Sequence, residues 1–243
     1  MNLIVDIGNT LVKLAVFKGD KLLVKFSVPE EAALKIIKEI FFEYTQIRRS
    51  IVSSVRKLDN HCLEYLKIKS KLLVLDANTP VPFTNLYKTP RTLGLDRVAL
   101  ISASVRHYFG KPTLVIDAGT CVTFDFKDDK NAYLGGGISP GLQMRYKALN
   151  QFTANLPVLE PTEVESIIGR STEESMHSGV VYGLVKEIDG VIAEYQNKYG
   201  DLTVILTGGD ANFLSKQLKS SIFANPNFLM EGLNNILQFN AIE

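Results

Sequence analysis

The sequence has no tryptophan, two cysteines and three histidines among 243 residues. Cys62 and Cys121 lack the spacing of a metal site or a disulfide framework, which indicates a reducing cytoplasm. The histidines adjoin no group of carboxylates, so we assign them no metal role. No apolar run approaches the roughly 20 residues of a membrane span, and no basic segment precedes the first apolar residues. We expect a cytoplasmic protein with no signal peptide and no membrane partner.

An excess of charge of one sign is also missing. The chain carries 27 basic and 26 acidic residues, for a formal net charge of +1. Overall charge therefore gives no support to binding of nucleic acid or of an anionic membrane. Hydrophobic residues make up 46% and charged residues 22%, which is ordinary for a globular protein with a sizeable core. The length fits one large domain or two of roughly 110 to 130 residues.

Two short segments of the chain are nearly the same. Residues 3–10 read LIVDIGNT and residues 114–120 read LVIDAGT. In each, an apolar run is followed by Asp, one further residue and Gly, with Thr shortly after. The aspartates, Asp6 and Asp117, are 117 − 6 = 111 positions apart, a little under half of the chain. Duplication of one domain leaves such a spacing. We predict two lobes, residues 1–111 and 112–243, and two loops that face across a cleft and hold a nucleotide triphosphate.

The same order of elements is expected in each half. Both halves read as three strands, a helix, a strand and a helix, with apolar residues at helical or strand-like spacing and turn residues between them. This order predicts two mixed-sheet α/β lobes. The expected strands are 3–6, 11–17, 21–26, 50–53 and 72–75, then 113–117, 122–126, 132–134 and 203–207; the expected helices are 29–41, 59–67 and 95–108, then 142–150, 172–199 and 211–218, with a loop over 76–93.

The first repeated loop has residue types that suit phosphate binding. Gly8 lets the backbone approach a phosphate, and Asn9 and Thr10 offer donors to its oxygens. Lys13 could add a positive charge. Asp6, at a strand end, is placed to hold a hydrated Mg²⁺, which prefers carboxylate and water oxygens. The alternative is a hairpin whose Asp and Asn only satisfy the turn.

The second loop and a later glycine pair extend this pattern. Gly119 and Thr120 would face phosphate in the same way, and Asp117 could bind a cation or orient water. Gly208 and Gly209 lie between a strand and a helix, where the backbone can pass close to a flat ligand. Asp210 could cap the following helix. Alternatively, the whole segment is only a helix cap and contacts no ligand.

Gly94-Leu95-Asp96-Arg97 marks the point where a proline-rich loop becomes a helix. Asp96 could take a proton from a substrate hydroxyl, and Arg97 could hold an anionic group. A carboxylate at a helix start is also a common cap. The glycine-rich stretch 135–141 could form a wall of the substrate pocket or simply connect a hairpin to a helix. Residues 169–174 have the pattern of a helix start, where Ser171 or Thr172 would cap the helix and Glu174 would help to close a capping box.

Taken in order, these motifs resemble the actin-like ATPase and sugar-kinase superfamily, and more narrowly the type III pantothenate kinases. Asp-x-Gly-Asn-Thr, Gly-x-Asp-Arg, Asp-Ala-Gly-Thr, Gly-Gly-x-Ile-x-Pro-Gly and Thr-Gly-Gly-Asp-Ala follow one another over nearly the full length. The resemblance implies two tandem ribonuclease H-like lobes, each a mixed sheet flanked by helices. It also implies transfer of a phosphoryl group from ATP to pantothenate, the first step of coenzyme A biosynthesis.

The resemblance implies roles for individual residues. Asp96 would be the proton acceptor, and Asp117 would coordinate K⁺ or NH₄⁺. Mg²⁺ would be held by Asp6 through water. Family members are homodimers whose substrate pocket is completed across the interface, so Thr172 would act from the partner subunit. The residues implied to bind ATP phosphates are Asp6, Ile7, Gly8, Asn9, Thr10, Leu11, Val12, Lys13, Gly119 and Thr120, with Gly208 and Gly209 at the adenosine; those implied at pantothenate are Tyr87, Gly94, Leu95, Asp96, Arg97 and Thr172.

Two other functions fit the same fold. A small sugar or carboxylate kinase would keep the phosphate loops and change the acceptor. A nucleotide-responsive regulator without catalysis would keep the fold alone, since the family also includes proteins named as accessory transcription factors. Asp6, Asp96 and Asp117 argue against the regulator, because a non-catalytic protein has no reason to keep all three.

Overall fold

The computed structural model describes residues 1–8, 10–54 and 60–241. The chain divides into two compact units, Met1–His107 with Asn227–Glu243, and Tyr108–Pro226. The sequence predicts one boundary near residue 111, whereas the structure also returns the C-terminal segment to the first unit. Among the described residues, none of the helices combines the length and the apolar character needed to cross a bilayer.

The first unit is built on a mixed sheet with the strand order β3-β2-β1-β4-β5. β1 pairs antiparallel with β2 and parallel with β4, while β2–β3 is antiparallel and β4–β5 is parallel. The strands are β1 (Asn2–Ile7), β2 (Val12–Lys18), β3 (Lys21–Val28), β4 (Arg49–Ser54) and β5 (Lys71–Val74).

Helices cover both faces of this sheet. Alternate residues of a strand point to opposite faces, so Leu3, Val5 and Ile7 pack on α1 (Glu30–Glu43) and α2 (Asn60–Lys69). Ile4 instead packs with α3 (Leu95–His107) and α8 (Phe228–Phe239) on the other face. Asp6 is in phase with Ile4 and therefore points to the face that α3 covers. The loop before α3 contains β6 (Thr84–Asn85) and the 3₁₀ turn η1 (Pro90–Thr92).

The last helix completes the core of the first unit. Met230, Leu233, Ile236 and Leu237 of α8 are buried in the same apolar cluster as Ile4 and Phe17. A Cβ atom on Gly232 would lie 1.9 Å from the carbonyl oxygen of Ala99, so only glycine allows α8 to approach α3 this closely. Helix α8 is absent from the elements expected from the sequence, although its apolar residues recur at helical spacing.

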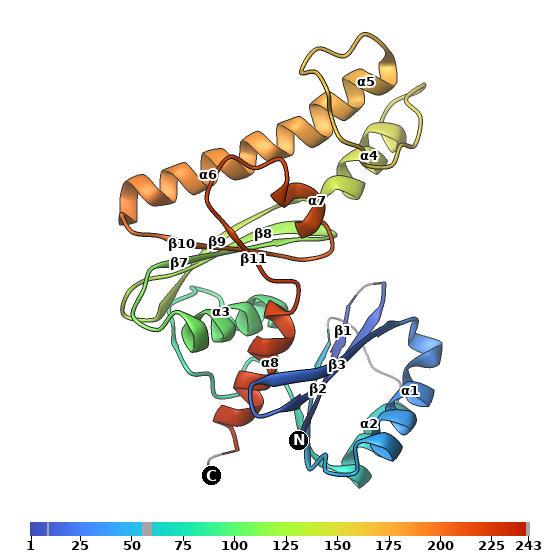
Figure 1. Ribbon diagram of the computed structural model, residues 1–243, viewed down its shortest axis with the longest axis vertical. Coiled ribbons are helices and arrows are strands. Elements are labelled where there is room, and N and C mark those ends of the chain that lie inside the picture. The colour runs from blue at the N-terminus through green and yellow to red at the C-terminus, as the bar shows by residue number, and fades with distance from the viewer. Residues whose placement is uncertain (9, 55–59, 242–243) are drawn as a thin grey trace. The chain divides into compact units, whose positions relative to one another are not determined.

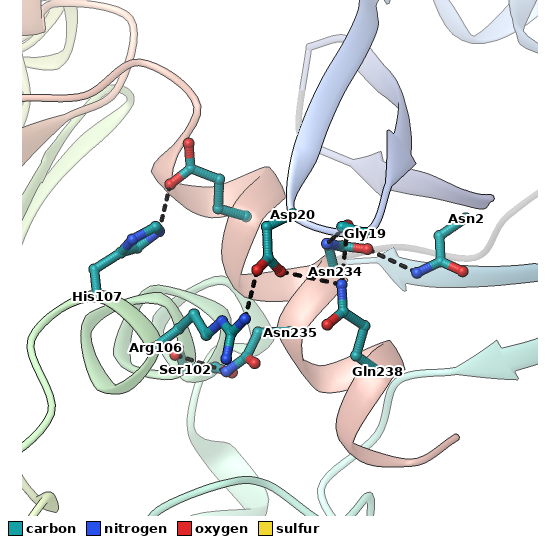
Figure 2. Close-up of polar contacts among 10 residues, drawn as sticks. Asn2, Gly19, Asp20, Ser102, Arg106, His107, Asn234, Asn235 and Gln238 are labelled. Atoms are coloured by element: carbon teal, nitrogen blue, oxygen red, sulfur yellow. Dashed lines mark hydrogen bonds and ion pairs between the residues drawn. The ribbon is translucent and has the colours of Figure 1, made fainter. Parts of the chain in front are cut away.

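Polar contacts fix α8 along its length (Figure 2). The Asn2 amide donates to the Asn234 side chain at 2.8 Å, and the Asn234 amide donates to the Gly19 carbonyl at 3.0 Å. The Asn235 amide donates to Ser102 of α3, and His107 pairs with Glu231 at 2.9 Å. The helix is therefore hydrogen-bonded to the β2–β3 turn, to β1 and to α3.

The second unit repeats the strand order of the first. Its sheet contains β9-β8-β7-β10-β11, with β7 antiparallel to β8 and parallel to β10. This order and these directions match β3-β2-β1-β4-β5 strand for strand, as a duplication predicts. The strands are β7 (Thr113–Ala118), β8 (Cys121–Lys127), β9 (Ala132–Pro140), β10 (Thr203–Thr207) and β11 (Phe223–Ala224).

The helices of the second unit form one apolar core with one face of the sheet, to which Leu114, Ile116 and Leu206 contribute. Figure 1 shows α5 and α6 as one long rod across this sheet. The helices are α4 (Leu142–Gln151), α5 (Thr172–His177), α6 (Gly183–Tyr199) and α7 (Ala211–Ser215), with a π turn, η2 (Ser178–Tyr182), between α5 and α6.

Three predicted elements differ in extent. β9 continues through the glycine-rich stretch to Pro140, because Gly136 lets it pack on β8: a Cβ there would lie 1.6 Å from the Phe124 carbonyl oxygen. This stretch is therefore part of a strand, whereas the strand expected from the sequence ends at residue 134. The helix expected over 211–218 ends at Ser215, and the helix expected over 172–199 contains the π turn.

Candidate functional site

The first cluster of predicted site residues is organised by Asp6 at the carboxyl end of β1. Its neighbours across the sheet are Lys13 on β2 and Ser53 on β4. Asp6 is 7% exposed, and burial raises the pKa of its carboxyl to about 6. The charge of Lys13 and a hydrogen bond from Ser53 oppose this rise, while the charge of Asp96 adds to it. Lys13 and Asp96 therefore both lie within electrostatic reach of Asp6.

The loop after Asp6 is a short closed turn. The Gly8 amide donates to the Leu11 carbonyl at 3.1 Å, which closes the turn between Ile7 and Val12. Ile7 and Val12 are fully buried, so they anchor the loop and present no side chain to a ligand. Thr10 and Leu11 are exposed. Asn9 lies outside the described residues.

Asp96 lies in the first turn of α3, and its carboxylate folds back over the helix start. The Asp96 carboxylate accepts a hydrogen bond from the Arg97 amide at 2.8 Å. A Cβ on Gly94 would lie 2.4 Å from Asp96 Oδ1, so the glycine leaves room for the carboxylate. The Gly-x-Asp spacing thus has a steric reason. Asp96 therefore satisfies a helix-start amide, and its charge also acts on Asp6.

Arg97 and Tyr87 come together although ten positions separate them. Arg97 is 5% exposed, and its guanidinium carbon lies 5.7 Å from the centre of the Tyr87 ring. This distance is within the range of a cation–π contact. Leu95, by contrast, packs against the apolar cluster between the sheet, α3 and α8. The structure thus places Tyr87 beside Arg97 and makes Leu95 part of the packing.

The second cluster surrounds the β7–β8 turn. Asp117 pairs across the sheet with Thr123 on β8 and Thr207 on β10. Gly208 has φ +98°, and a Cβ there would lie 2.4 Å from Asp117 Oδ1 and 2.2 Å from the Ala118 carbonyl oxygen. The glycine therefore brings the β10–α7 loop directly against Asp117.

Two further glycines shape the same turn. The Gly119 amide donates to the Cys121 carbonyl at 2.9 Å. A Cβ on Gly141 would lie 2.0 Å from the Gly119 carbonyl oxygen, so β9 ends in contact with this turn. Cβ atoms on Gly119 and Gly209 would meet nothing within 4 Å, so both positions face open space that a ligand could enter. The sequence pattern groups Gly119 with Gly208 and Gly209 but gives no indication of the contact with Gly141.

Asp210 does not cap α7, contrary to one expectation from the sequence. It stands at the N-cap position with φ −92° and ψ 0°, and its side chain makes no capping hydrogen bond. Its amide instead donates to the Ala118 carbonyl at 2.9 Å, and burial raises the pKa of its carboxyl. This backbone hydrogen bond is a second contact between the β10–α7 loop and the β7–β8 turn.

Thr172 is the first residue of α5 and is exposed. The preceding Ser171 is the N-cap and accepts a hydrogen bond from the Glu174 amide at 3.2 Å. Glu174 in turn accepts from the Arg170 amide at 2.6 Å, so the predicted capping box forms with its second bond shifted one residue outward.

Sequence reasoning missed Ser53 as a member of the first cluster. It is 2% exposed and donates a hydrogen bond to Asp6 from the neighbouring parallel strand. A usable signal was present: Ser53 ends a predicted buried strand, and the carboxyl ends of adjacent parallel strands meet at one sheet edge. Among the described residues, no group of three or more His, Cys, Asp or Glu side chains could hold a metal ion by itself.

Solved structures with the same fold include a transcriptional activator and a hexokinase. A Campylobacter jejuni structure described as a Baf family transcriptional activator matches at 23% identity and a TM-score of 0.63, over 98% of each chain. The ROK hexokinase from Thermus thermophilus matches at 12% identity and a TM-score of 0.52, over 98% of this chain and 99% of its own. At these identities the likeness shows the fold alone, an actin-like ATPase and sugar-kinase fold.

Closer relatives share much more of the sequence. A type III pantothenate kinase from Christiangramia forsetii is 50% identical over 240 residues, which cover 99% of each chain. Another from Phocaeicola vulgatus is 45% identical over 244 residues, again 99% of each chain. Residues 2–194 match the type III pantothenate kinase family as a whole. The chain belongs to the type III pantothenate kinase family.

Proposed function

We propose that this protein transfers the γ-phosphoryl group of ATP to the primary hydroxyl of pantothenate, the first step of coenzyme A biosynthesis. Membership of the family over the full length supports the substrate and the reaction. The observation that carries the mechanism is the juxtaposition of Asp96 and Asp6 on one face of the first sheet, with Lys13 beside Asp6. Phosphoryl transfer needs such a base close to groups that bind phosphate and metal.

Asp96 is the proton acceptor in this proposal. Phosphoryl transfer has a loose transition state in which the hydroxyl proton leaves late, so positioning matters more than a strong base. Gly94 and the Arg97 amide hold the carboxylate in place at the start of α3. Arg97, beside Tyr87, would bind the carboxylate end of pantothenate, because guanidinium groups pair well with carboxylates.

The first cluster suits phosphate and Mg²⁺. Burial opposes the charged form of Asp6, and a bound cation would reverse that penalty, so a hydrated Mg²⁺ fits this donor. When bound, Mg²⁺ would neutralise charge on the phosphate oxygens. Lys13 and the backbone amides of the Gly8–Leu11 turn would hold the phosphates, as the resemblance implies for residues 6–13.

The second cluster would add contacts to ATP and a monovalent cation. Asp117 would coordinate K⁺ or NH₄⁺, and Gly119 and Thr120 would contact phosphate. Gly209 and Gly208 would pass beside the adenosine, which agrees with the open space at Gly209. Gly208 lies directly against Asp117, so the β10–α7 loop would contribute to both the adenosine site and the cation site.

The proposal also includes a cytoplasmic homodimer in which Thr172 reaches the partner's substrate. Neither Cys62 nor Cys121 forms a disulfide in the part of the chain that the structure describes, which agrees with a reducing compartment. Apolar side chains stand exposed around α4 and α5, which favours burial against a second copy. These are Phe152 at 80% exposure, Val158 at 58%, Ile167 at 61% and Ile168 at 71%. Sedimentation equilibrium would report a dimer.

A coupled ADP-release assay with Mg·ATP tests the proposal. It is run with and without pantothenate, in K⁺ and in Na⁺ buffer. ADP release that needs both pantothenate and K⁺ is the expected result. Folded protein that binds ATP but stays inactive with pantothenate would contradict the proposal; release with a sugar or another acceptor would identify a different kinase, and binding without any turnover would favour a regulator.

A further inference from the structure

A π turn interrupts the helix that begins at Thr172. His177, Ser178, Tyr182 and Gly183 all have right-handed helical backbone angles, so α5, η2 and α6 form one continuous helix (Figure 1). π turns are rare and occur mostly as single turns inside α-helices, frequently at functional sites. Neither the ATP clusters nor the predicted base uses this turn. Its position between Thr172 and the core-packed part of α6 suggests a role in orientation.

The buried residues of this helix show what the π turn does. Met176, Val180, Leu184, Ile188 and Ile192 are spaced by four residues, and each is at most 5% exposed. In a regular α-helix four residues span about 400°, which exceeds one full turn by about 40°. Over the four steps from Met176 to Ile192, the row of buried residues would therefore drift by about 160° around the helix. The extra residue of a π turn sets the rotation back by about 100°. η2 therefore keeps α5 and α6 packed on the same side.

A hydrogen bond holds α5 at this rotation. The hydroxyl of Tyr146, a fully buried residue of α4, lies 2.7 Å from His177 Nδ1. The two rings also meet edge to face, with centroids 5.6 Å apart. Burial raises the pKa of Tyr146 to about 12, so the phenol keeps its proton over the range in which kinases work. This is the one polar side-chain contact recorded between α4 and α5 in the part of the chain that the structure describes.

The segment before Thr172 depends on the rotation of α5. A Cβ on Gly169 would lie 2.3 Å from the Ser175 amide nitrogen, so the segment packs directly on the helix backbone. The Ser178 hydroxyl donates to the Ile167 carbonyl at 2.6 Å. Rotation of α5 would therefore move this segment and the Ser171 cap together with Thr172.

We propose that Tyr146, His177 and the π turn η2 are positioning elements that set the direction in which Thr172 is presented to pantothenate. They touch no substrate themselves and act through α5. The inference rests on the proposed function, because it takes Thr172 to contact pantothenate. It predicts a specific signature: loss of the Tyr146–His177 bond weakens the use of pantothenate and leaves the use of ATP unchanged.

The first test is Tyr146→Phe, with Tyr199→Phe as the matched control. Tyr199 stacks on Phe126 at the far end of the same helix. For Tyr146→Phe we expect KM for pantothenate to rise up to about tenfold, the scale of one hydrogen bond, with kcat and KM for ATP within about twofold. The control should match the wild type. His177→Asn retains a hydrogen-bonding group near Nδ1 and should restore most of what His177→Leu loses.

The second test adds one residue to the helix. Insertion of an alanine after Gly179, where a Cβ would meet nothing within 4 Å, should rotate α5 by about 100° relative to α6, the angle of one helical residue. We expect loss of pantothenate-dependent turnover with ATP binding retained. Deletion of Gly179 is the control, because it converts the π turn to an α turn without rotating α5 and should retain turnover. If the insertion variant does not fold, Thr172→Val combined with Tyr146→Phe replaces it. If the effects of the two substitutions on KM for pantothenate are not additive, Tyr146 and Thr172 act through the same helix.

The outcomes separate the inference from the proposed function. An active wild type with an unchanged pantothenate KM in Tyr146→Phe overturns the inference and leaves the function standing. Equal rises in KM for both substrates also overturn it, because they indicate general loosening of the unit. Folded wild-type protein without pantothenate-dependent ADP release overturns the proposed function, and the inference with it.

Discussion

The two hairpins that carry Asp6 and Asp117 share a backbone plan and differ in their charges. In the first, Ile7 pairs with Val12 across four intervening residues; in the second, Ala118 pairs with Val122 across three. Each aspartate has a hydroxyl residue opposite it on the parallel strand, Ser53 or Thr207. On the antiparallel strand, however, Asp6 faces Lys13, whereas Asp117 faces Thr123.

This difference shows how a duplicated element can take a second role. The first hairpin combines a buried carboxylate with a lysine, the pairing that metal-bound phosphate requires. The second has no lysine opposite its aspartate and is surrounded by Gly119, Gly141 and Gly208, so its surface is mostly backbone. Backbone amides and carbonyls can bind phosphate or a monovalent cation without adding charge.

The largest expected effect lies in the first cluster. Asp96→Asn should reduce turnover by roughly 10² to 10⁴, since it removes the base while the amide keeps the shape of the side chain. ATP affinity, measured by isothermal titration calorimetry, should stay within a few-fold of the wild type. Near wild-type turnover in the ADP-release assay would remove Asp96 from the role of base.

The glycine loop of the second cluster offers a matched pair of variants. Gly208→Ala combines a left-handed φ of +98° with backbone clashes, and should cost about 2–4 kcal/mol of unfolding free energy. Gly209→Ala meets no atom within 4 Å and should leave the melting temperature unchanged while raising KM for ATP. Equal stability losses in the two variants would contradict the packing described for Gly208.

Substitution of Asp6 by Asn should raise the stability of the protein and lower its activity. The Asp6 pKa of about 6 lies above the ordinary value, so the folded chain retains a proton that the unfolded chain has released between about pH 4 and 6. Ionisation in the folded state therefore costs stability as the pH rises through this range. Without nucleotide at about pH 7.5, Asp6→Asn should gain about 1–3 kcal/mol, and the gain should vanish near pH 4.

The same Asp6→Asn variant should use Mg·ATP poorly. Thermal unfolding followed by circular dichroism at several pH values measures the stability, and kcat/KM for Mg·ATP measures the activity. A variant that is destabilised at neutral pH would show that the Lys13 and Ser53 contacts outweigh the burial of charge. Unchanged Mg²⁺ dependence would refute the metal assignment.

The smallest effect is expected at Asp117. Asp117→Asn should raise the K⁺ concentration for half-maximal activity by about tenfold, equivalent to about 1.4 kcal/mol, because one charged ligand is lost. Asp210→Asn is the control, as the nearby Asp210 side chain makes no capping bond. If the two variants respond to K⁺ alike, the cation site is not at Asp117.

The repeated LIVD and LVID segments predicted the two-lobed fold because local pattern determines strands, and a repeated order of strands determines a repeated sheet. The sequence also indicated Asp6, Asp96 and Asp117 by their places at strand and helix ends. It could not indicate Ser53, Gly141 or the pairing of Tyr87 with Arg97, since these depend on which segments the fold brings together. The π turn was hidden for another reason: spacing by four residues suits an α-helix equally well over a short stretch.

The place of α8 in the chain has a consequence for biosynthesis. Residues 108–226 are contiguous and have their own core, whereas the first unit needs residues 227–241 to cover Ile4, Phe17 and Ile51. The ribosome therefore releases all of the second unit before the segment that the first unit requires. Multidomain chains usually fold from the N-terminus onward. Here the later half can mature first, while an apolar sheet face of the earlier half stays open to chaperones until residues 227–241 have been made.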